Sequence, residues 1–133
     1  MKERPKGVRP LSAERGLTPR GVISLWLPVL AYTAFIFWLS SAPRPAPPLL
    51  RWPGADKLVH LGEYIPLGVL LLRAFGGSQF PAALASGTTI GALDEMFQGF
   101  VPTRHMSSWD LLADVAGVVI GVVIYRWKRA KTP

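Results

Sequence analysis

Long apolar stretches alternate with short polar or proline-rich segments along the chain, and this pattern predicts an all-helical protein. The clearest stretch, residues 22–39, contains no charged side chain and is about as long as a helix that crosses a bilayer. The small residues at 40–42 are typical of a signal-peptide cleavage site, but the stretch is longer than a signal core and Pro43 follows the would-be cut. We therefore expect a retained membrane-spanning helix.

The next two helices are expected to form a hairpin with a very short turn. Asp56 can cap a helix over residues 57–75, and Gly76-Gly77 would end it. Ser78 can then cap a third helix over residues 79–100. Because the turn is so short, these two helices should run antiparallel and side by side.

Proline-containing connectors flank this hairpin. Residues 43–53 contain five prolines, so this segment cannot be helical and is expected outside the hydrocarbon. Residues 101–103 interrupt the chain after the third helix. Ser107 and Asp110 then form a capping-box-like start, with Asp in place of Glu, for a fourth helix that ends near Trp127.

Small residues recur every four positions in the last two helices. Ala83, Gly87 and Gly91 follow this spacing in the third helix, and Gly117 and Gly121 follow it in the fourth. Small residues at this interval let helix backbones approach closely in a membrane. We expect them at helix–helix contacts.

Composition favours a membrane protein over a soluble domain. The 133 residues are 50% hydrophobic and 17% charged, whereas charged residues make up about 25% of an average soluble domain. The net charge of +7 would suit a nucleic-acid-binding protein, but such proteins gather basic residues on one folded face. Here they flank apolar segments, so we expect no nucleic-acid partner. The lack of cysteine excludes disulfides, zinc–thiolate sites and iron–sulfur clusters.

The distribution of basic residues predicts the orientation in the membrane. Ten of the fifteen Lys and Arg lie near the two ends of the sequence: Lys2, Arg4, Lys6, Arg9, Arg15, Arg20, Arg126, Lys128, Arg129 and Lys131. Basic residues close to spans stay in the cytoplasm. We therefore predict an all-α, integral-membrane four-helix bundle with both termini cytoplasmic. Its expected parts are a basic tail at 1–21, a four-span domain at 22–127 and a second basic tail at 128–133.

The acidic residues point to function. Six of the eight lie in or beside the expected spans: Asp56, Glu63, Asp94, Glu95, Asp110 and Asp114. An ionised side chain costs at least about 2.5 kcal/mol at the bilayer centre, so such residues are rare without a use. On the second helix, the spacing i, i+4, i+7, i+8 places Asp56, His60, Glu63 and Tyr64 on one face.

Helical spacing also places polar side chains from three segments at matching depths. A rise of about 1.5 Å per residue puts one set about 9–11 Å below the outer edge: Glu63, Asp94 and Asp114. A shallower set lies at about 3–5 Å: His60, Gln98 and Asp110. The mouth would contain Asp56, Arg104, His105 and Ser107, with Tyr64 and Glu95 as further lining candidates. The sequence thus predicts one outward-facing polar cup.

Several of these residues also have a purely structural explanation. Asp56 would suffice as a helix cap, and Asp110 would favour the positive end of the fourth helix in any case. A lone His60 is more often a hydrogen-bonded interior residue than a ligand. Glu95 can also pair with Arg104. For these residues both explanations stay open at the level of sequence.

Three motifs carry a family resemblance. The first is Trp38-Leu39-Ser40-Ser41-Ala42-Pro43, and the second is Asp56-Lys57-xx-His60-xxx-Tyr64. The third and most specific is Asp94-Glu95-xx-Gln98-x-Phe100-x-Pro102-x-Arg104-xx-Ser107-xx-Asp110-xxx-Asp114-xx-Gly117-xxx-Gly121. Together they resemble the VanZ-like family of small bacterial membrane proteins, over about residues 22–127. In that family the position of Asp114 is frequently Asn, and the extra acid here favours a shared proton or a bound cation.

The resemblance implies a multi-pass protein of the bacterial cytoplasmic (inner) membrane with a role in the cell envelope. The family's namesake is associated with resistance to the glycopeptide antibiotic teicoplanin. We expect the cup to bind a lipid headgroup, a wall precursor or a glycopeptide-related ligand, with Arg104 and His105 holding a phosphate or carboxylate. The acids below them would repel that anion unless they were protonated or bound to a metal.

Three other functions stay open, and one of them is a purely structural assembly factor. A membrane-embedded hydrolase or transferase would use His60 with carboxylates as an acid/base pair or to hold a divalent cation, and the candidate metal ligands are His60, Glu63, Asp94 and Asp114. The sequence contains neither HExxH nor G-x-S-x-G. A proton or cation pathway would also use membrane carboxylates, but the inner half of the predicted bundle is apolar.

Overall fold

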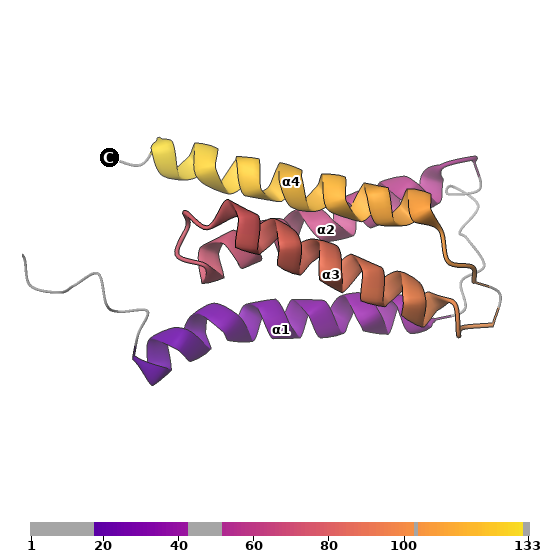
Figure 1. Ribbon diagram of the computed structural model, residues 1–133, viewed down its shortest axis with the longest axis horizontal. Coiled ribbons are helices and arrows are strands. Elements are labelled where there is room, and N and C mark those ends of the chain that lie inside the picture. The colour runs from indigo at the N-terminus through magenta and orange to yellow at the C-terminus, as the bar shows by residue number, and fades with distance from the viewer. Residues whose placement is uncertain (1–17, 43–51, 103, 132–133) are drawn as a thin grey trace, which may run out of the picture.

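The described chain is built from helices that alternate in direction. The computed structural model describes residues 18–42, 52–102 and 104–131. This part contains four helices and no strand: α1 (Pro19–Ser41), α2 (Ala55–Ala74), α3 (Phe80–Gln98) and α4 (Ser108–Ala130). The all-α prediction is therefore confirmed. The start of α1 and the end of α4 lie at the same end of the bundle (Figure 1), which we call the terminal end. The segments 1–17, 43–51 and 132–133 of the predicted tails and proline-rich connector lie outside the described residues.

Asp56 and Ser78 are not the helix caps that the sequence predicted. α2 is preceded by Gly54, whose φ of 89° lies in the left-handed region that glycine tolerates best. Asp56 lies one residue inside the helix, in its first turn. α3 is preceded by Gln79, and Ser78 lies before that cap position. A carboxylate in a first turn still favours the positive end of a helix, so Asp56 supports α2 without capping it.

The other helix ends lie closer to their predicted positions. Ser107 caps α4, because its hydroxyl accepts the backbone N–H of Asp110 at 3.3 Å. Gly76 and Gly77, with φ of 75° and 82°, end the α2 side of the hairpin as predicted. α1 begins earlier than residue 22 and α4 continues past Trp127. These two helices therefore take in parts of the predicted tails.

Small residues bring α2 and α4 into close contact. α2 packs most extensively on α4, and α1 packs on α2 and α3. A Cβ atom added to Gly117 or Gly121 would collide with backbone carbonyls of α2. The predicted role of the small residues in packing is confirmed. Gly68 of α2, which the sequence did not single out, meets the backbone of Val118 in the same way.

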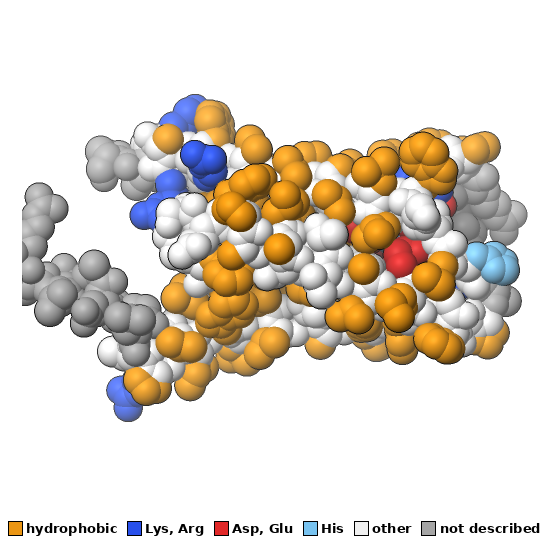
Figure 2. Space-filling view, viewed as in Figure 1, with side chains coloured by type: hydrophobic (Ala, Val, Ile, Leu, Met, Phe, Trp, Pro, Cys, Tyr) orange, Lys and Arg blue, Asp and Glu red, His pale blue; other side chains and the backbone are white. Residues whose placement is uncertain are grey.

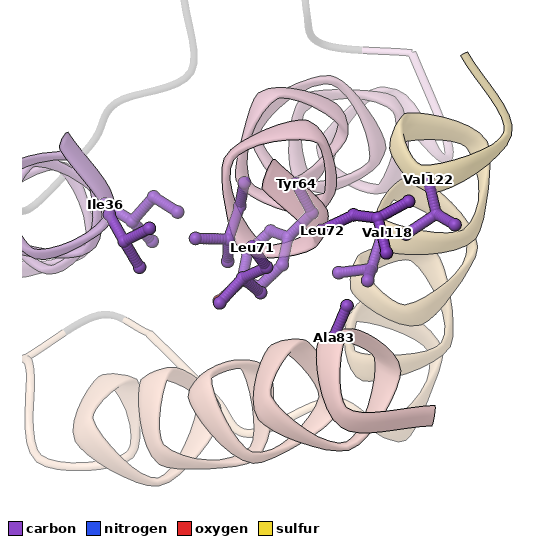
Figure 3. Packing of buried hydrophobic residues seen from close by; sticks show 9 residues of the cluster. Ile36, Tyr64, Leu71, Leu72, Ala83, Val118 and Val122 are labelled. Carbon is purple, nitrogen blue, oxygen red and sulfur yellow. The ribbon is translucent and has the colours of Figure 1, made fainter. Parts of the chain in front are cut away.

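An apolar core joins all four described helices. Ile36 of α1, Leu71 of α2, Ala83 of α3 and Val122 of α4 are each at most 1% exposed, and their side chains converge between the helices (Figure 3). Of these four residues, Leu71, Ala83 and Val122 lie toward the terminal end. The half of the bundle near that end therefore contains apolar side chains, which leaves the buried polar side chains to the opposite end.

The exterior of the bundle is also apolar. Hydrophobic side chains are spread over the whole length of the face in Figure 2. Leu27, Trp38, Leu93 and Trp109, from three of the helices, are each more than half exposed. Within the described residues, α1 and α4 are long and apolar enough to cross a membrane. Large apolar side chains exposed on this scale, together with buried charged side chains, differ from the usual arrangement in a soluble domain.

Candidate functional site

Polar side chains from all four helices are buried together at one end of the bundle. In the described part of the chain the buried polar and charged residues are Ser40, His60, Asp94, Glu95, Gln98, Asp110 and Asp114. We call them the polar cluster. They come from the end of α1, the start of α2, the end of α3 and the start of α4, so they lie at the end opposite to the termini. We call this the polar end.

The α1–α3 side of the polar cluster is centred on Asp94. Its Oδ2 atom accepts hydrogen bonds from the Ser40 hydroxyl at 2.9 Å and from the Gln98 amide at 2.8 Å. Arg104 donates to the backbone carbonyl of Ser40 at 3.0 Å. Asp94 is fully buried, and its second oxygen has no hydrogen-bond partner among the described residues. The carboxylate is thus held firmly on one side only.

The α2–α4 side is centred on a histidine–carboxylate pair. His60 Nδ1 lies 2.9 Å from Asp114 Oδ1, and both side chains are buried. When the Asp114 carboxylate is ionised it can only accept, so Nδ1 is then the donor, and a neutral ring keeps the lone pair of Nε2. Asp114 Oδ2 and the Tyr64 hydroxyl have no hydrogen-bond partner within the described segments. The pair therefore orients the imidazole, and Asp114 Oδ2 beside it can still accept a hydrogen bond.

Glu95 lies between these two sides and does not pair with Arg104, as the sequence had suggested. Its Oε2 accepts the backbone N–H of Ser107 at 2.7 Å, because the chain turns back over the end of α3 to begin α4. Its Oε1 lies 3.9 Å from His60 Nδ1 and has no hydrogen-bond partner among the residues that the structure describes. The Glu95 side chain is only 5% exposed, so this oxygen is buried.

A lysine links the polar cluster to the surface. Lys57 Nζ lies 3.1 Å from Asp110 Oδ1 and 2.8 Å from Asp56 Oδ2. The Asp56 side chain is 57% exposed, whereas that of Asp110 is 10% exposed. Asp56 therefore lies at the rim of the polar cluster, and Asp110 lies within the cluster. Lys57 neutralises part of the charge at the rim.

Three candidate ligand atoms converge among the described residues, and they differ from the predicted metal set. His60, Glu95 and Asp110 each offer one atom, and these atoms lie within 4.8 Å of one another. The predicted set of His60, Glu63, Asp94 and Asp114 shares only the histidine. Glu63 is half-buried, and its backbone carbonyl accepts a hydrogen bond from Tyr32 at 2.9 Å.

A pocket of about 200 Å³ opens beside the polar cluster, between α3 and α4. Its lining residues are Ala92, Glu95, Met96, Met106, Ser107, Ser108 and Leu111. Acidic atoms are visible at this part of the surface, surrounded by hydrophobic side chains (Figure 2). The pocket is therefore an apolar recess on the side of the bundle with Glu95 in its wall.

The comparisons with known proteins agree with the fold and the motifs. A family model described as VanZ/LLP1 matches residues 15–129. The chain belongs to the VanZ/LLP1 family. The predicted resemblance is thus confirmed, over a match that takes in nearly all of the described helices. A comparison with curated proteins found no match, and a comparison with solved structures found none.

Two residues of this VanZ/LLP1 chain join the polar cluster without having been proposed for it. Ser40 bonds to Asp94, and Lys57 bonds to Asp110. Both belong to the family motifs, which was the available signal. Ser40 lies one residue beyond the expected span at 22–39, and Lys57 was expected only as the first residue of the second helix. His105, which was expected at the mouth, is exposed.

Proposed function

We propose that this VanZ/LLP1 protein spans the bacterial cytoplasmic membrane four times, with both termini in the cytoplasm and the polar cluster facing outward. The charges of the two ends support this orientation. The basic side chains at the terminal end are Arg20, Arg73, Arg126, Lys128, Arg129 and Lys131, and Figure 2 shows such side chains gathered there. The described polar end has only Lys57 and Arg104. Basic residues near spans favour the cytoplasmic side.

We include α2 and α3 among the proposed membrane spans, although they contain charged residues, because their charged side chains are mainly turned toward the inside of the bundle. α2 has 20 residues and α3 has 19, and at about 1.5 Å per residue each is close to the 30 Å of a hydrocarbon core. Asp94, Glu95 and His60 are buried against other helices, while Leu58, Leu93 and Met96 face outward. This inward arrangement is the one found for ionisable residues in membrane bundles.

The proposed function is to bind the polar headgroup of a membrane lipid or of a lipid-linked wall precursor at the outer membrane surface. The observation that carries this proposal is the set of buried carboxylate oxygens without hydrogen-bond partners among the described residues, at Asp94, Glu95 and Asp114. Leaving a buried acceptor unpaired costs about 1–3 kcal/mol, and more when it is charged. A bound polar group that supplies donors or positive charge would repay that cost.

Two further features suit a lipid-linked ligand. The pocket between α3 and α4 is lined mainly by Ala92, Met96, Met106 and Leu111, side chains that can contact an acyl or prenyl chain. Arg104 uses one guanidinium nitrogen on the Ser40 carbonyl, and its other donors suit a phosphate or carboxylate at the rim. Headgroup and chain would thus be contacted by adjoining surfaces.

Native mass spectrometry of the protein purified from membranes in mild detergent tests this function. We expect the wild type to retain a lipid or precursor mass, and Arg104→Ala to lower its occupancy about tenfold, because a charge-assisted hydrogen bond contributes about 1.5–3 kcal/mol. Thr89→Val is the control, since Thr89 is exposed on α3 and bonds only to the Ala85 carbonyl of its own helix. A bare wild-type mass, or equal occupancy in both variants, would contradict the proposal. A glycopeptide-related ligand is identified by its mass in the same spectra.

A hydrolase or transferase acting on the same class of ligand is the second candidate. The 2.9 Å pair of His60 and Asp114 favours it, because a carboxylate that orients an imidazole is the usual partner of a histidine base. Under this alternative the bound mass would be converted on incubation, and a product mass would replace it. Under the binding function the bound mass would stay constant.

A further inference from the structure

We propose that His60, Glu95 and Asp110 form a binding site for one divalent first-row metal ion, with Asp114 as the residue that orients the imidazole. This inference deepens the proposed function and rests on it for the nature of the ligand, although the metal site can be tested separately. It concerns how an acidic cluster binds an anionic headgroup.

The geometry of three converging donors is the first argument. One atom each from His60, Glu95 and Asp110 lies within 4.8 Å of the other two, and the residues come from α2, α3 and α4. Metal bonds to imidazole nitrogen and carboxylate oxygen are about 2.0–2.2 Å long, so ligands on opposite sides of an ion lie about 4 Å apart. Small side-chain adjustments would close the site. A mixed nitrogen and oxygen donor set suits Zn²⁺ or Mn²⁺.

A buried oxygen that lacks a hydrogen-bond partner is the second argument. Glu95 Oε1 has none among the described residues, and its side chain is 5% exposed. This oxygen lies 3.9 Å from His60 Nδ1, which is too long for a hydrogen bond, so it stays available as a ligand atom beside the imidazole. The other Glu95 oxygen is held by the Ser107 N–H at 2.7 Å, so the carboxylate is already oriented.

The Asp114–His60 hydrogen bond is the third argument. Histidines that bind metals usually donate their other ring N–H to a carboxylate, which fixes the tautomer and makes the free nitrogen a stronger ligand. Asp114 Oδ1 lies at hydrogen-bonding distance from Nδ1, 2.9 Å, and Asp114 is fully buried, so it fits this orienting role. The arrangement leaves Nε2 as the ligand atom.

Charge balance is the fourth argument. Glu95, Asp110 and Asp114 surround His60, and Lys57, which contacts Asp110, is shared with Asp56. A divalent ion would neutralise the remaining negative charge. With three protein ligands it would also keep an open coordination position, as catalytic and ligand-binding metal sites do. A phosphate oxygen entering through the pocket beside Glu95 could occupy that position.

Metal titration of the chelator-stripped protein in detergent is the test. We expect the wild type to bind one Zn²⁺ or Mn²⁺ per chain by isothermal titration and elemental analysis. Asp110→Asn should weaken binding at least tenfold, and Asp114→Asn about 10–100-fold, as loss of a supporting carboxylate does elsewhere. Thr89→Val is the control, because Thr89 is exposed on α3, bonds to the Ala85 carbonyl of its own helix and is not among the converging ligands. It should bind metal as the wild type does.

Three outcomes would overturn the metal site. They are a wild type that binds neither ion, a Thr89→Val variant that loses as much affinity as Asp110→Asn, and a Co²⁺-loaded wild type whose visible spectrum is unchanged by His60→Ala. The spectrum reports on the histidine ligand in protein that remains folded. A wild type that carries lipid but binds neither ion would remove the metal site and leave the proposed function standing. A wild type that binds metal but never a lipid would leave the metal site standing and remove the proposed function.

Discussion

Asp94 and Glu95 are neighbours in the sequence, and both are buried, yet they face different partners. Asp94 faces α1, where Ser40 donates to it at 2.9 Å. Glu95 faces α4, where the Ser107 N–H donates to it at 2.7 Å. Adjacent helical residues point about 100° apart, so two consecutive acids can both be buried only when helices lie on both sides. At the scale of the residue, the polar cluster is therefore two linked groups around α3.

The Ser40–Asp94 hydrogen bond should contribute measurably to stability. Ser40→Ala removes one of the two donors to Asp94, and we expect the free energy of unfolding to fall by about 1–2 kcal/mol because the acceptor stays buried. Thermal unfolding in detergent measures this. Ser41→Ala is the control, since Ser41 is exposed and bonds to Trp38 within its own helix. Equal losses in both variants would contradict the assignment.

Sequence periodicity identified most of the buried polar residues but not their partners. His60, Asp94, Gln98 and Asp114 were expected together because one-turn spacing places them on common helix faces. For Glu95, a place in the lining and a pair with Arg104 both stayed open, and Ser40 was not expected at all. Those contacts depend on how each helix is rotated against its neighbours and on the path of the α3–α4 connector, neither of which a periodic pattern specifies.

At the scale of the element, helix existence was predictable and helix partners less so. Each apolar stretch became a helix, because length and apolar content suffice for that. The short turn at Gly76-Gly77 predicted the α2–α3 hairpin, yet α2 packs most extensively on α4. The reason is the small-residue contact at Gly68, Gly117 and Gly121, which brings two helices together that are far apart in sequence. A spacing rule identifies such a surface but not the helix that it meets.

The α2–α4 contact should tolerate no added methyl group. In Gly121→Ala the new Cβ would collide with the Ile65 carbonyl of α2, so the helices must separate, and we expect a loss of about 1–3 kcal/mol. Gly62→Ala is the matched control, because a Cβ on Gly62 meets nothing within 4 Å. Alanine is the better helix former by about 1 kcal/mol, so this control should be as stable as the wild type or more so. A Gly121→Ala protein with an unchanged melting temperature would contradict the close approach.

At the scale of the whole molecule, polar and apolar residues are sorted in two directions. From outside to inside, exposed Trp38 and Trp109 give way to buried Asp94 and Asp114. Along the bundle, basic residues gather at the terminal end and the buried acids lie at the polar end. The first direction suits a lipid surrounding, and the second suits a fixed orientation in it. Both patterns follow from composition and periodicity, so they were visible in the sequence.

The central claim is that the polar cluster faces outward in the membrane, and cysteine accessibility tests it most directly. The chain contains no cysteine, so all labelling of a single-cysteine variant comes from the introduced residue. His105→Cys lies in the exposed α3–α4 connector at the polar end, and Ser78→Cys lies in the exposed α2–α3 turn at the terminal end. The reagent is a maleimide that cannot cross the cytoplasmic membrane, applied to cells whose outer layers let it pass. It should label His105→Cys in intact cells. It should label Ser78→Cys only after the cytoplasmic membrane has been permeabilised. Labelling of Ser78→Cys alone, or of both variants before permeabilisation, would contradict the account.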